Sequence, residues 1–348
     1  MPFIAASGPR LRAVKLEYNA VEHCNYGCRE CSHFSPHLAV RHSDLSAFER
    51  DVAALAPVYH VERFRFVGGE PLLHKQLVDF VAAVRDSGIA DTIEVVTNGS
   101  MLHRVDDRLF RSIDFLSISW YADPRFDERK LALAREKCHA HGTTLKVKRA
   151  NEFRMMQLTE PIGDPQLVDD VYRSCQIAHS WYCQTFLDGF FYLCSRPLFT
   201  ASYLQTRGRP APDLRRLDGV PLHEPDLRGR LEAYLARGEP LESCRHCLGT
   251  VGKRIEWGQM PLAERRATAP LGRRAEEAIS RGVLAYLLRW ERAERVILRL
   301  VPSLRVARAL TVLKEATMRA VSENTEKRRP YRLLRGRRHA TPRTTSTT

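Results

Sequence analysis

Eight of the nine cysteines of this 348-residue chain fall into two groups, and their distribution constrains the fold more than any other feature. Three of them, Cys24, Cys28 and Cys31, lie within eight residues of one another, five lie in the range 175–247, and Cys138 stands apart. The N-terminus lacks the apolar stretch of a secretory signal, which predicts a cytoplasmic protein. Cytoplasmic thiols stay reduced, so this density of cysteines indicates metal or redox chemistry rather than a disulfide framework.

Strand and helix patterns alternate between residue 13 and about residue 150. The segments with strand character are 13–19, 63–67, 92–97, 115–120 and 144–148. Ser46 and Glu49 form a capping box that is expected to open the first intervening helix. Such alternation predicts an α/β fold with a parallel sheet and outer helices, here a partial (β/α)6 TIM-like barrel. Polar motifs follow several of these strands, and the C-terminal edge of a barrel sheet is where chemistry is placed.

The rest of the chain divides into three further segments. Residues 151–250 are expected to form a connector and a small cysteine-bearing domain, with a β-hairpin of strands 181–187 and 190–194 around Asp188-Gly189. Residues 251–326 read as a basic helical extension, with helices near 274–301 and 303–321. Residues 327–348 are polar and threonine-rich, which predicts disorder.

The net charge of +14 is concentrated at the C-terminal end. Residues 251–348 hold 23 Lys and Arg against 9 Asp and Glu, whereas the first 250 residues hold 32 of each sign. A basic amphipathic helix can dock on the barrel, lie on an anionic membrane surface or contact nucleic acid. Docking is the first expectation and an anionic membrane surface the second; nucleic acid is the least expected partner.

The first cysteine group carries the main chemical prediction. Three thiolates at this spacing suit a [4Fe–4S] cubane, which normally takes four cysteines, so one iron is left open for another ligand. The segment CNYGCREC at residues 24–31 resembles the CxxxCxxC loop of the radical S-adenosylmethionine (SAM) superfamily. That resemblance implies that Cys24, Cys28 and Cys31 hold the cluster. It also implies that SAM binds the open iron and is cleaved to a 5′-deoxyadenosyl radical.

Two later motifs extend the resemblance over roughly residues 13–150. GGEP at residues 68–71 resembles the GGE motif that contacts the SAM amino group, which assigns Gly68, Gly69 and Glu70 to SAM binding. Asn98 in the TNG motif and Ser119 (with Ser117) lie where the superfamily contacts the SAM ribose and carboxylate. Zinc also accepts three cysteines and is the alternative for the first group, but zinc does not explain GGEP.

One position departs from the family pattern. The residue before the third cysteine is usually aromatic and packs near the SAM adenine, whereas here it is Glu30. Phe34 is the expected substitute for this contact.

The second cysteine group resembles the auxiliary-cluster pattern of the SPASM/twitch extensions. The implied ligands of a second [4Fe–4S] cluster are Cys175, Cys194, Cys244 and Cys247, with Cys183 as the alternative to Cys175. A structural zinc ribbon remains open for the same residues. Cys183 and Cys194 are placed symmetrically about the hairpin turn and are therefore expected to be cross-strand neighbours.

The fifth thiol of this group has a candidate catalytic role. Radical SAM epimerases return hydrogen to the substrate radical from a cysteine, and Cys183 is the candidate donor, whereas Cys138 is expected to be a packing residue. The predicted function is therefore radical chemistry on a C–H bond of a small polar substrate such as a sugar, aminocyclitol or nucleoside intermediate. The outcome would be epimerisation, dehydrogenation or decarboxylation, with flavodoxin or ferredoxin as electron donor.

Two other substrate classes remain open. The alternatives are a peptide maturase and an RNA-modifying enzyme. Only about two dozen residues precede Cys24, which leaves no expected N-terminal peptide-recognition module.

Overall fold

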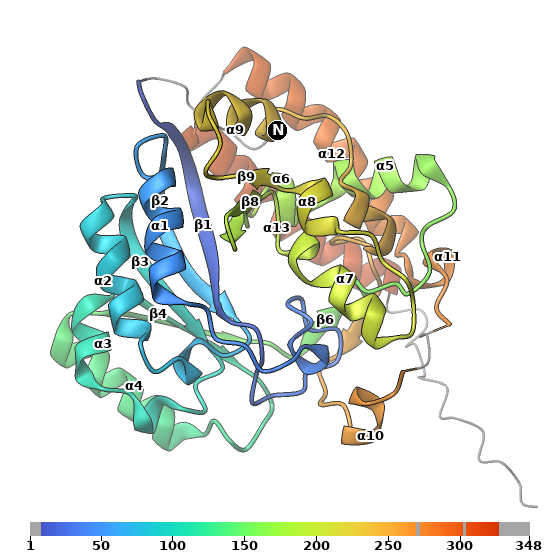
Figure 1. The fold of residues 1–348 in the computed structure, drawn as a ribbon. Coiled ribbons are helices and arrows are strands. Elements are labelled where there is room, and N and C mark those ends of the chain that lie inside the picture. The colour runs from blue at the N-terminus through green and yellow to red at the C-terminus, as the bar shows by residue number, and fades with distance from the viewer. Residues whose placement is uncertain (1–7, 269–271, 302–303, 327–348) are drawn as a thin grey trace, which may run out of the picture.

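A computed structural model describes residues 8–268, 272–301 and 304–326 (Figure 1). Its central feature is an eight-stranded sheet in the order β5-β4-β3-β2-β1-β7-β8-β9. Neighbouring strands from β1 to β5 pair in parallel. The bounds of these strands are β1 (Leu11–Val21), β2 (Tyr59–Gly68), β3 (Ala90–Thr97), β4 (Phe115–Trp120) and β5 (Thr144–Arg149). The predicted α/β class with a partial barrel is confirmed.

The sixth parallel strand comes from the cysteine-bearing segment. β7 (Thr185–Leu187) pairs in parallel with β1, on the edge opposite β2. β8 (Phe190–Tyr192) and β9 (Val220–Pro221) follow antiparallel. The strand next in sequence after β5, β6 (Glu152–Arg154), leaves the sheet and pairs antiparallel with β10 (Arg254–Glu256). The second half of the chain therefore extends the first sheet instead of forming a separate layer.

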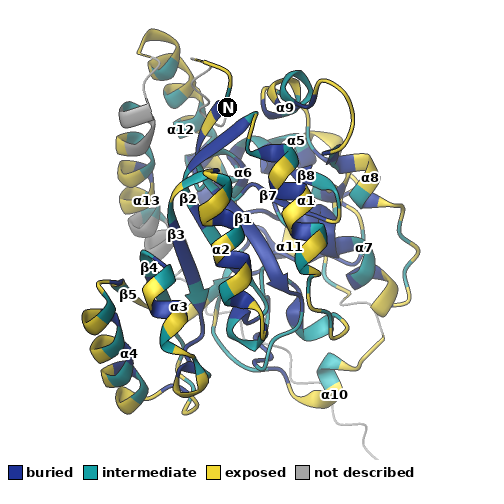
Figure 2. Ribbon diagram, turned by 60° about the vertical axis from the view of Figure 1, so that its left-hand side comes forward, coloured by how far each residue is buried: buried dark blue, intermediate teal, exposed yellow. Residues whose placement is uncertain are grey.

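Four helices cover the outer face of the parallel strands: α1 (Leu45–Leu55), α2 (Leu77–Ser87), α3 (Asp107–Ser112) and α4 (Glu128–His141). Figure 2 shows the strands buried beneath helices whose outward faces are exposed. Alternate residues of a strand face opposite sides, so Tyr18 and Phe66 point outward into an aromatic core with Phe48 of α1. Aromatic side chains of this size supply much of the burial that holds helices to the sheet.

The first helix begins earlier than its capping box predicted. Asp44 is the N-cap, and its Oδ1 accepts a hydrogen bond from the Ala47 backbone N–H at 2.8 Å, which places Ser46 inside the helix. The prediction of a cap at Ser46 is wrong because the carboxylate of Asp44 already satisfies a free N–H at the positive end of the helix.

The hairpin turn lies where the sequence placed it, but its strands are shorter. Asp188 and Gly189 have φ of 52° and 79°, the left-handed pair that a two-residue hairpin turn requires. The ladder runs only from Thr185 opposite Tyr192 to Leu187 opposite Phe190. The ladder stops at Thr185 and Tyr192, so neither Cys183 nor Cys194 belongs to it.

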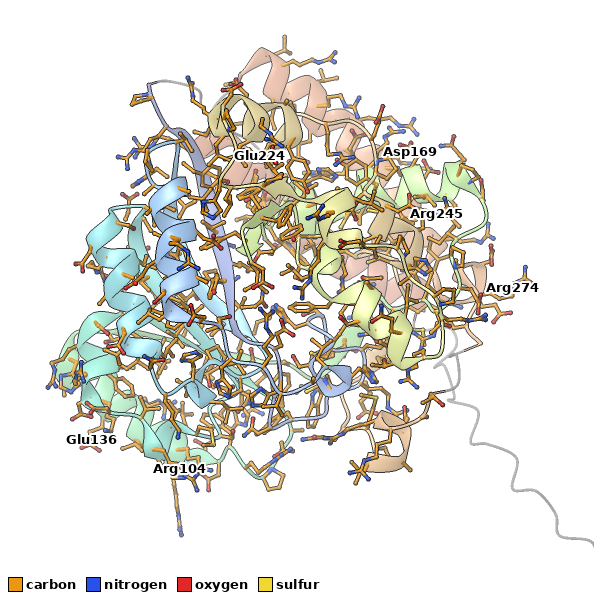
Figure 3. The ribbon with its side chains drawn as sticks, viewed as in Figure 1. Arg104, Glu136, Asp169, Glu224, Arg245 and Arg274 are labelled. Atoms are coloured by element: carbon orange, nitrogen blue, oxygen red, sulfur yellow. The ribbon has the colours of Figure 1, made fainter. Side chains whose placement is uncertain are left out.

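The remaining helices surround this hairpin and continue into the basic extension. They are α5 (Pro165–Ser174), α6 (Gln176–His179), α7 (Arg196–Thr206), α8 (Leu214–Asp218), α9 (Leu227–Leu235), α10 (Leu262–Arg265), α11 (Ala275–Ala278), α12 (Arg281–Leu300) and α13 (Leu304–Glu326). Charged side chains such as Arg245 and Arg274 project from the periphery (Figure 3).

The helical extension docks on the cysteine-bearing domain. Val283 and Leu287 of α12 are buried in a core that includes Val168 and Val171 of α5. Arg173 of α5 also forms an ion pair with Glu291 at 3.1 Å. Docking was expected, but on the barrel; the extension packs on α5 because the apolar stripe of α12 faces it.

The C-terminal part differs from its predicted division at residues 251–260. Residues 251–260 were assigned to the helical extension, yet they include β10, whose partner β6 lies before the cysteine-bearing domain. Residues 327–348, predicted to be disordered, lie outside the described residues. Among the residues that the structure describes, no helix has the length and apolar character to cross a membrane.

Candidate active site

The first cysteine group lies on the loop that follows β1. Burial is the main cause that raises the pKa of the Cys28 thiol to about 12, and nearby Cys31 adds to it. Burial also raises the pKa of Cys24, with the Glu70 carboxylate as the second cause. The loop thus brings the three thiols close enough to influence one another. The raised pKa values keep the Cys24 and Cys28 thiols protonated in the metal-free chain, so binding a metal cluster must release protons from them.

Each of two thiols accepts hydrogen bonds from N–H groups around it. The indole Nε1–H of Trp257 donates to Cys28 Sγ at 3.2 Å. Cys24 Sγ accepts from the Tyr26 backbone N–H at 3.3 Å and from the Asn98 amide at 3.7 Å. Donors of this kind stabilise thiolates and set the potential of clusters bound through them.

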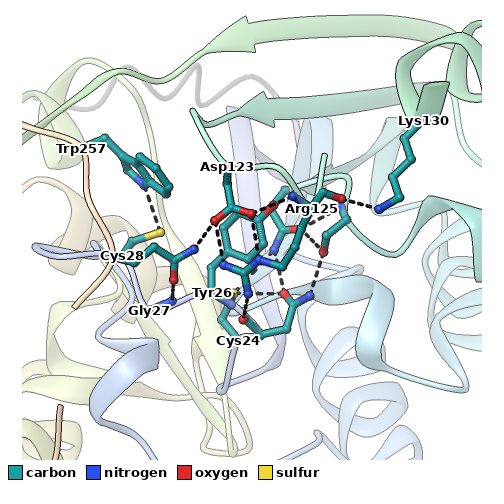
Figure 4. A network of polar contacts seen from close by, with 12 residues as sticks. Cys24, Tyr26, Gly27, Cys28, Asp123, Arg125, Lys130 and Trp257 are labelled. Atoms are coloured by element: carbon teal, nitrogen blue, oxygen red, sulfur yellow. Dashed lines mark hydrogen bonds and ion pairs between the residues drawn. The ribbon is translucent and has the colours of Figure 1, made fainter. Parts of the chain in front are cut away.

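A segment that no sequence motif singled out crosses the cysteine loop (Figure 4). The Gln259 side chain accepts from the Gly27 backbone N–H at 2.8 Å and donates to Asp123 at 2.6 Å. Gly27 O accepts from the Met260 backbone N–H at 2.8 Å, which completes a backbone clamp. Arg125 lies 4.0 Å over the Tyr26 ring and donates to Asn25 O at 2.7 Å. These contacts join segments that lie far apart in the sequence, 232 residues for Gly27 and Gln259 and 100 residues for Asn25 and Arg125, and no local pattern could have revealed them.

The two glycines of GGEP let β2 end directly against the cysteine loop. Gly68 has φ of 120°, and a Cβ there would lie 2.4 Å from Val21 O. A Cβ on Gly69 would lie 1.7 Å from His23 O. Only glycine fits such close backbone approach, so the structure gives these residues a packing role besides the predicted contact with SAM.

Glu70 is fully buried between the ends of β2 and β3. Its carboxylate accepts hydrogen bonds from the Thr97 hydroxyl at 2.6 Å and the Asn98 backbone N–H at 2.8 Å. Burial raises the pKa of Glu70 to about 7, against the opposing effect of these hydrogen bonds. A carboxyl poised near neutrality is ready to pair with a cation that reaches it.

The two other predicted SAM contacts also lie at this edge. The Asn98 side chain donates to Asn25 Oδ1 at 2.9 Å, which ties the end of β3 to the cysteine loop. Ser119, near the end of β4, hydrogen-bonds Tyr121. Tyr121 in turn stacks on Trp257 with ring centroids 5.3 Å apart. The structure therefore gathers the loop, Glu70, Asn98 and Ser119 at one edge of the sheet.

The sequence profile of the Radical SAM superfamily matches residues 18–144, the stretch that holds the cysteine loop, Glu70, Asn98 and Ser119. Residues 18–144 form a radical SAM domain. Membership of this superfamily of enzymes implies one [4Fe–4S] cluster and SAM as cofactors.

Curated relatives match a part of the chain. A GTP 3′,8-cyclase from Microcystis aeruginosa is 29% identical over 101 residues, 28% of this chain and 31% of the relative. An S-adenosylmethionine-dependent nucleotide dehydratase from Selenomonas ruminantium is 30% identical over 113 residues, 31% of this chain and 39% of the relative. The chain thus spans about a third of the length of these relatives.

Solved structures resemble the chain only loosely. BtrN in complex with AdoMet and 2-DOIA aligns over 38% of this chain and 56% of BtrN, with 19% identity and a TM-score of 0.30. Streptococcus suis SuiB bound to S-adenosylmethionine aligns over 64% of this chain and 69% of SuiB, with 12% identity and a TM-score of 0.30. Likeness at this level transfers no activity.

The residues of the radical SAM domain fit its implied cofactors. Among the described residues, no three His, Cys, Asp or Glu side chains converge on the space of one metal ion. A cubane makes a different demand, because each thiolate binds a separate iron. The N–H donors at Cys24 and Cys28 suit bound thiolates, and the buried Glu70 carboxyl suits the SAM ammonium group.

The second cysteine group also comes together in space. Cys175, Cys194, Cys244 and Cys247 line one small cavity between α5, α7 and the segment before β10. Burial raises the pKa of Cys175 to about 11 and that of Cys194 further. These are the four residues that the sequence nominated as ligands.

A buried arginine that has no ion-pair partner among the described residues lines the same cavity. Arg196, the first residue of α7, is 4% exposed, and its Nε and Nη1 have no hydrogen-bond partner among the described residues. Its guanidinium lies 4.7 Å over the Phe34 ring, and its Nη2 reaches only the Met156 sulfur at 3.4 Å. An unpaired buried charge is costly, whereas four thiolates around a cubane form a net anionic group that would neutralise it. Arg196 therefore fits a cluster at these cysteines, and sequence reasoning missed it.

Cys183 is not part of this cavity. Its pKa is raised by burial and then by the Glu17 carboxylate, with Arg65 and Lys15 acting in the opposite direction. These are residues of β1 and β2, so Cys183 faces the inner side of the sheet. The expectation that Cys183 and Cys194 are cross-strand neighbours is wrong, because the β7–β8 ladder ends before these residues and the two thiols enter different environments.

Glu30 and Phe34 serve the packing of the cysteine loop. The Glu30 carboxylate pairs with Arg273 at 2.5 Å and accepts from the Met156 backbone N–H at 2.9 Å. Phe34 is 1% exposed and packs against Tyr203 at 4.9 Å between ring centroids. Glu30 thus faces the connector and Arg273, and the structure shows Phe34 inside the core.

Proposed function

We propose that this chain is a radical SAM enzyme that abstracts hydrogen from a C–H bond of a small polar substrate and carries a second [4Fe–4S] cluster. The radical SAM cluster would be held by Cys24, Cys28 and Cys31, and the second by Cys175, Cys194, Cys244 and Cys247. When bound, the first cluster and SAM supply the 5′-deoxyadenosyl radical, with an electron from flavodoxin or ferredoxin. The superfamily match supports the first cluster. The unpaired Arg196 beside four buried thiols is the observation that supports the second.

In this proposal the chain's own groups position and shield the reacting partners. Glu70 would hold the SAM ammonium group, and Asn98 and Ser119 would contact its ribose and carboxylate. The contacts of Trp257 and Gln259 would hold the cysteine loop in place and exclude water from it. Exclusion of water protects a reactive radical from side reactions.

The substrate class rests on two arguments. The names of two curated relatives specify nucleotides, which are small and polar, although each match covers less than a third of this chain. Lys15, Glu17 and Arg65 also make the inner side of the sheet polar. A sugar, aminocyclitol or nucleoside intermediate fits these features.

The deciding experiment is anaerobic reconstitution of the full chain. Two cubanes predict about eight iron and eight sulfide per chain. Replacing Cys24, Cys28 and Cys31 by Ala should remove about half of the iron and all 5′-deoxyadenosine formation, with dithionite as reductant. Persistence of SAM cleavage in this triple variant would exclude the proposed function, and four iron in the wild-type protein would exclude the second cluster.

A further inference from the structure

Charged side chains gather on the inner face of the parallel sheet, well below the strand ends that carry the cysteine loop. The register sets Lys15 beside Arg63, and Glu17 beside Arg65. Arg65 also lies beside Glu94 of β3. Most charges of a folded domain lie at its periphery, as in Figure 3, so a charged inner face needs a physical reason.

Both carboxylates of this group are occupied by one arginine. Arg65 Nη1 contacts Glu17 Oε1 at 2.6 Å, and Arg65 Nε contacts Glu94 Oε2 at 3.1 Å. The Ser117 hydroxyl also donates to Glu94. The carboxylates are thereby fixed as a scaffold for Arg65, and little of their charge remains for other cations.

Three further cations lie around this scaffold. Arg63 reaches Glu94 only at 3.8 Å, and its buried Nε has no hydrogen-bond partner in the part of the chain that the structure describes. The Arg63 guanidinium and the Lys146 ammonium lie 4.0 Å and 3.8 Å from the centroid of the same ring, that of Phe115. Within the described residues, neither Lys15 nor Lys146 has a carboxylate at ion-pair distance. Four cations therefore face two carboxylates.

The excess positive charge changes the pKa of Lys146. The pKa of Lys146 is lowered, first by burial, and Arg63, Arg65 and Lys15 add repulsion that the Glu94 carboxylate opposes. Side chains of Arg63 and Arg65 remain 28% and 20% exposed, so a ligand can reach them. Like charges held together in a partly desolvated site attract an anion strongly.

The distance between these cations and the SAM-binding edge of the sheet also suits a substrate site. Glu94 precedes Asn98 by four residues on β3, which corresponds to about 13 Å along the strand. A molecule with an anionic group at Lys146 and Arg63 could thus extend toward the SAM-binding edge. A phosphate group has three oxygens and a double charge. Several separate cationic donors therefore suit a phosphate better than they suit a carboxylate.

We propose that Lys15, Arg63 and Lys146 bind a phosphate group of the substrate, so that the substrate is a sugar phosphate or a nucleotide. This inference rests on the proposed function, and it deepens it by selecting phosphorylated substrates over neutral sugars and cationic aminocyclitols. Phe115 holds Arg63 and Lys146 in place, and the Glu17–Arg65–Glu94 scaffold fixes the surrounding wall.

The test measures binding of inorganic pyrophosphate to the reconstituted full chain by isothermal titration calorimetry at fixed ionic strength. Lys146→Met and Arg63→Met should each weaken binding by about tenfold or more, since each removes a charge-assisted hydrogen bond. Lys146→Arg should restore it. Arg129→Met, which removes an exposed cation of α4, is the matched control and should bind as the wild-type chain does.

Unchanged affinity in Lys146→Met and Arg63→Met, or equal weakening in Arg129→Met, would overturn the phosphate site. Tighter binding of citrate than of pyrophosphate would also overturn it, because the site would then select carboxylates. SAM cleavage by the wild-type chain is measured separately. If SAM is not cleaved but pyrophosphate still binds in a Lys146-dependent way, the proposed function is excluded and the anion site is retained.

Discussion

The indole of Trp257 donates a hydrogen bond to Cys28 Sγ across 229 residues of sequence, at 3.2 Å. The same ring stacks on Tyr121, so one side chain both covers the cysteine loop and supplies a donor to it. Hydrogen bonds to cluster-bound sulfur favour the reduced, more negative state of a cluster.

Trp257→Phe separates these two roles, because it keeps an aromatic ring and removes the N–H donor. We expect a more negative reduction potential of the radical SAM cluster and slower 5′-deoxyadenosine formation, with iron content retained. Redox titration followed by electron paramagnetic resonance measures the potential. An unchanged potential would show that the indole acts by packing alone.

Glu70 should make SAM binding depend on pH. Its pKa is raised to about 7, so the Glu70 carboxyl is mostly protonated below that pH. The protonated carboxyl must lose its proton before it can pair with the SAM ammonium group. Affinity should therefore rise by about tenfold between pH 6 and pH 8. Glu70→Gln should bind SAM more weakly by about 1.5–3 kcal/mol, with no such pH dependence and unchanged iron. Loss of iron in this variant would instead mark Glu70 as structural.

Arg196 should tune the second cluster through its charge. Arg196→Met removes the buried cation. Without this positive charge the more negative, reduced state of the cluster is less stable, so the reduction potential of that cluster should fall. A tenfold shift of the redox equilibrium corresponds to about 59 mV for one electron. Arg196→Lys, which keeps the charge, should shift it less. A packing role alone predicts lower stability in both variants with the potential unmoved.

Cys175 and Cys183 make opposite predictions for iron content. Cys175 lines the cavity with the other three nominated ligands, so Cys175→Ala should lose about four iron. Cys183→Ala should keep both clusters, and in an epimerase it should form 5′-deoxyadenosine without releasing the epimer. Loss of auxiliary iron only in Cys183→Ala would reverse the ligand assignment.

Docking of the helical extension can be tested at two leucines of α12. Leu287 is 2% exposed in the core shared with α5, whereas Leu300 is 78% exposed near the end of the helix. Leu287→Ala should lower the free energy of unfolding by about 2–5 kcal/mol, and Leu300→Ala should change it little. Chemical denaturation measures both, and equal effects would contradict the docked arrangement.

The sequence by itself determined the parts of this protein that depend on short-range order. CxxxCxxC, GGEP and TNG each follow a strand, and parallel strands bring their C-terminal ends to one edge, so their meeting could be predicted. Asp188-Gly189 fixed a hairpin turn because only a few residue types adopt two left-handed conformations in succession.

The tertiary structure alone decided the contacts between distant segments. The pairing of β7 with β1, the clamp of Trp257 and Gln259, and the position of Arg196 beside four thiols leave no periodic or local signature. The same holds for Cys183. The symmetry of the hairpin predicts a position beside Cys194, but the β7–β8 ladder ends at Thr185 and Tyr192, and Cys194 lines the cysteine cavity whereas Cys183 does not. Such contacts depend on how whole elements pack, and that packing is set by the sum of many weak interactions over the entire chain.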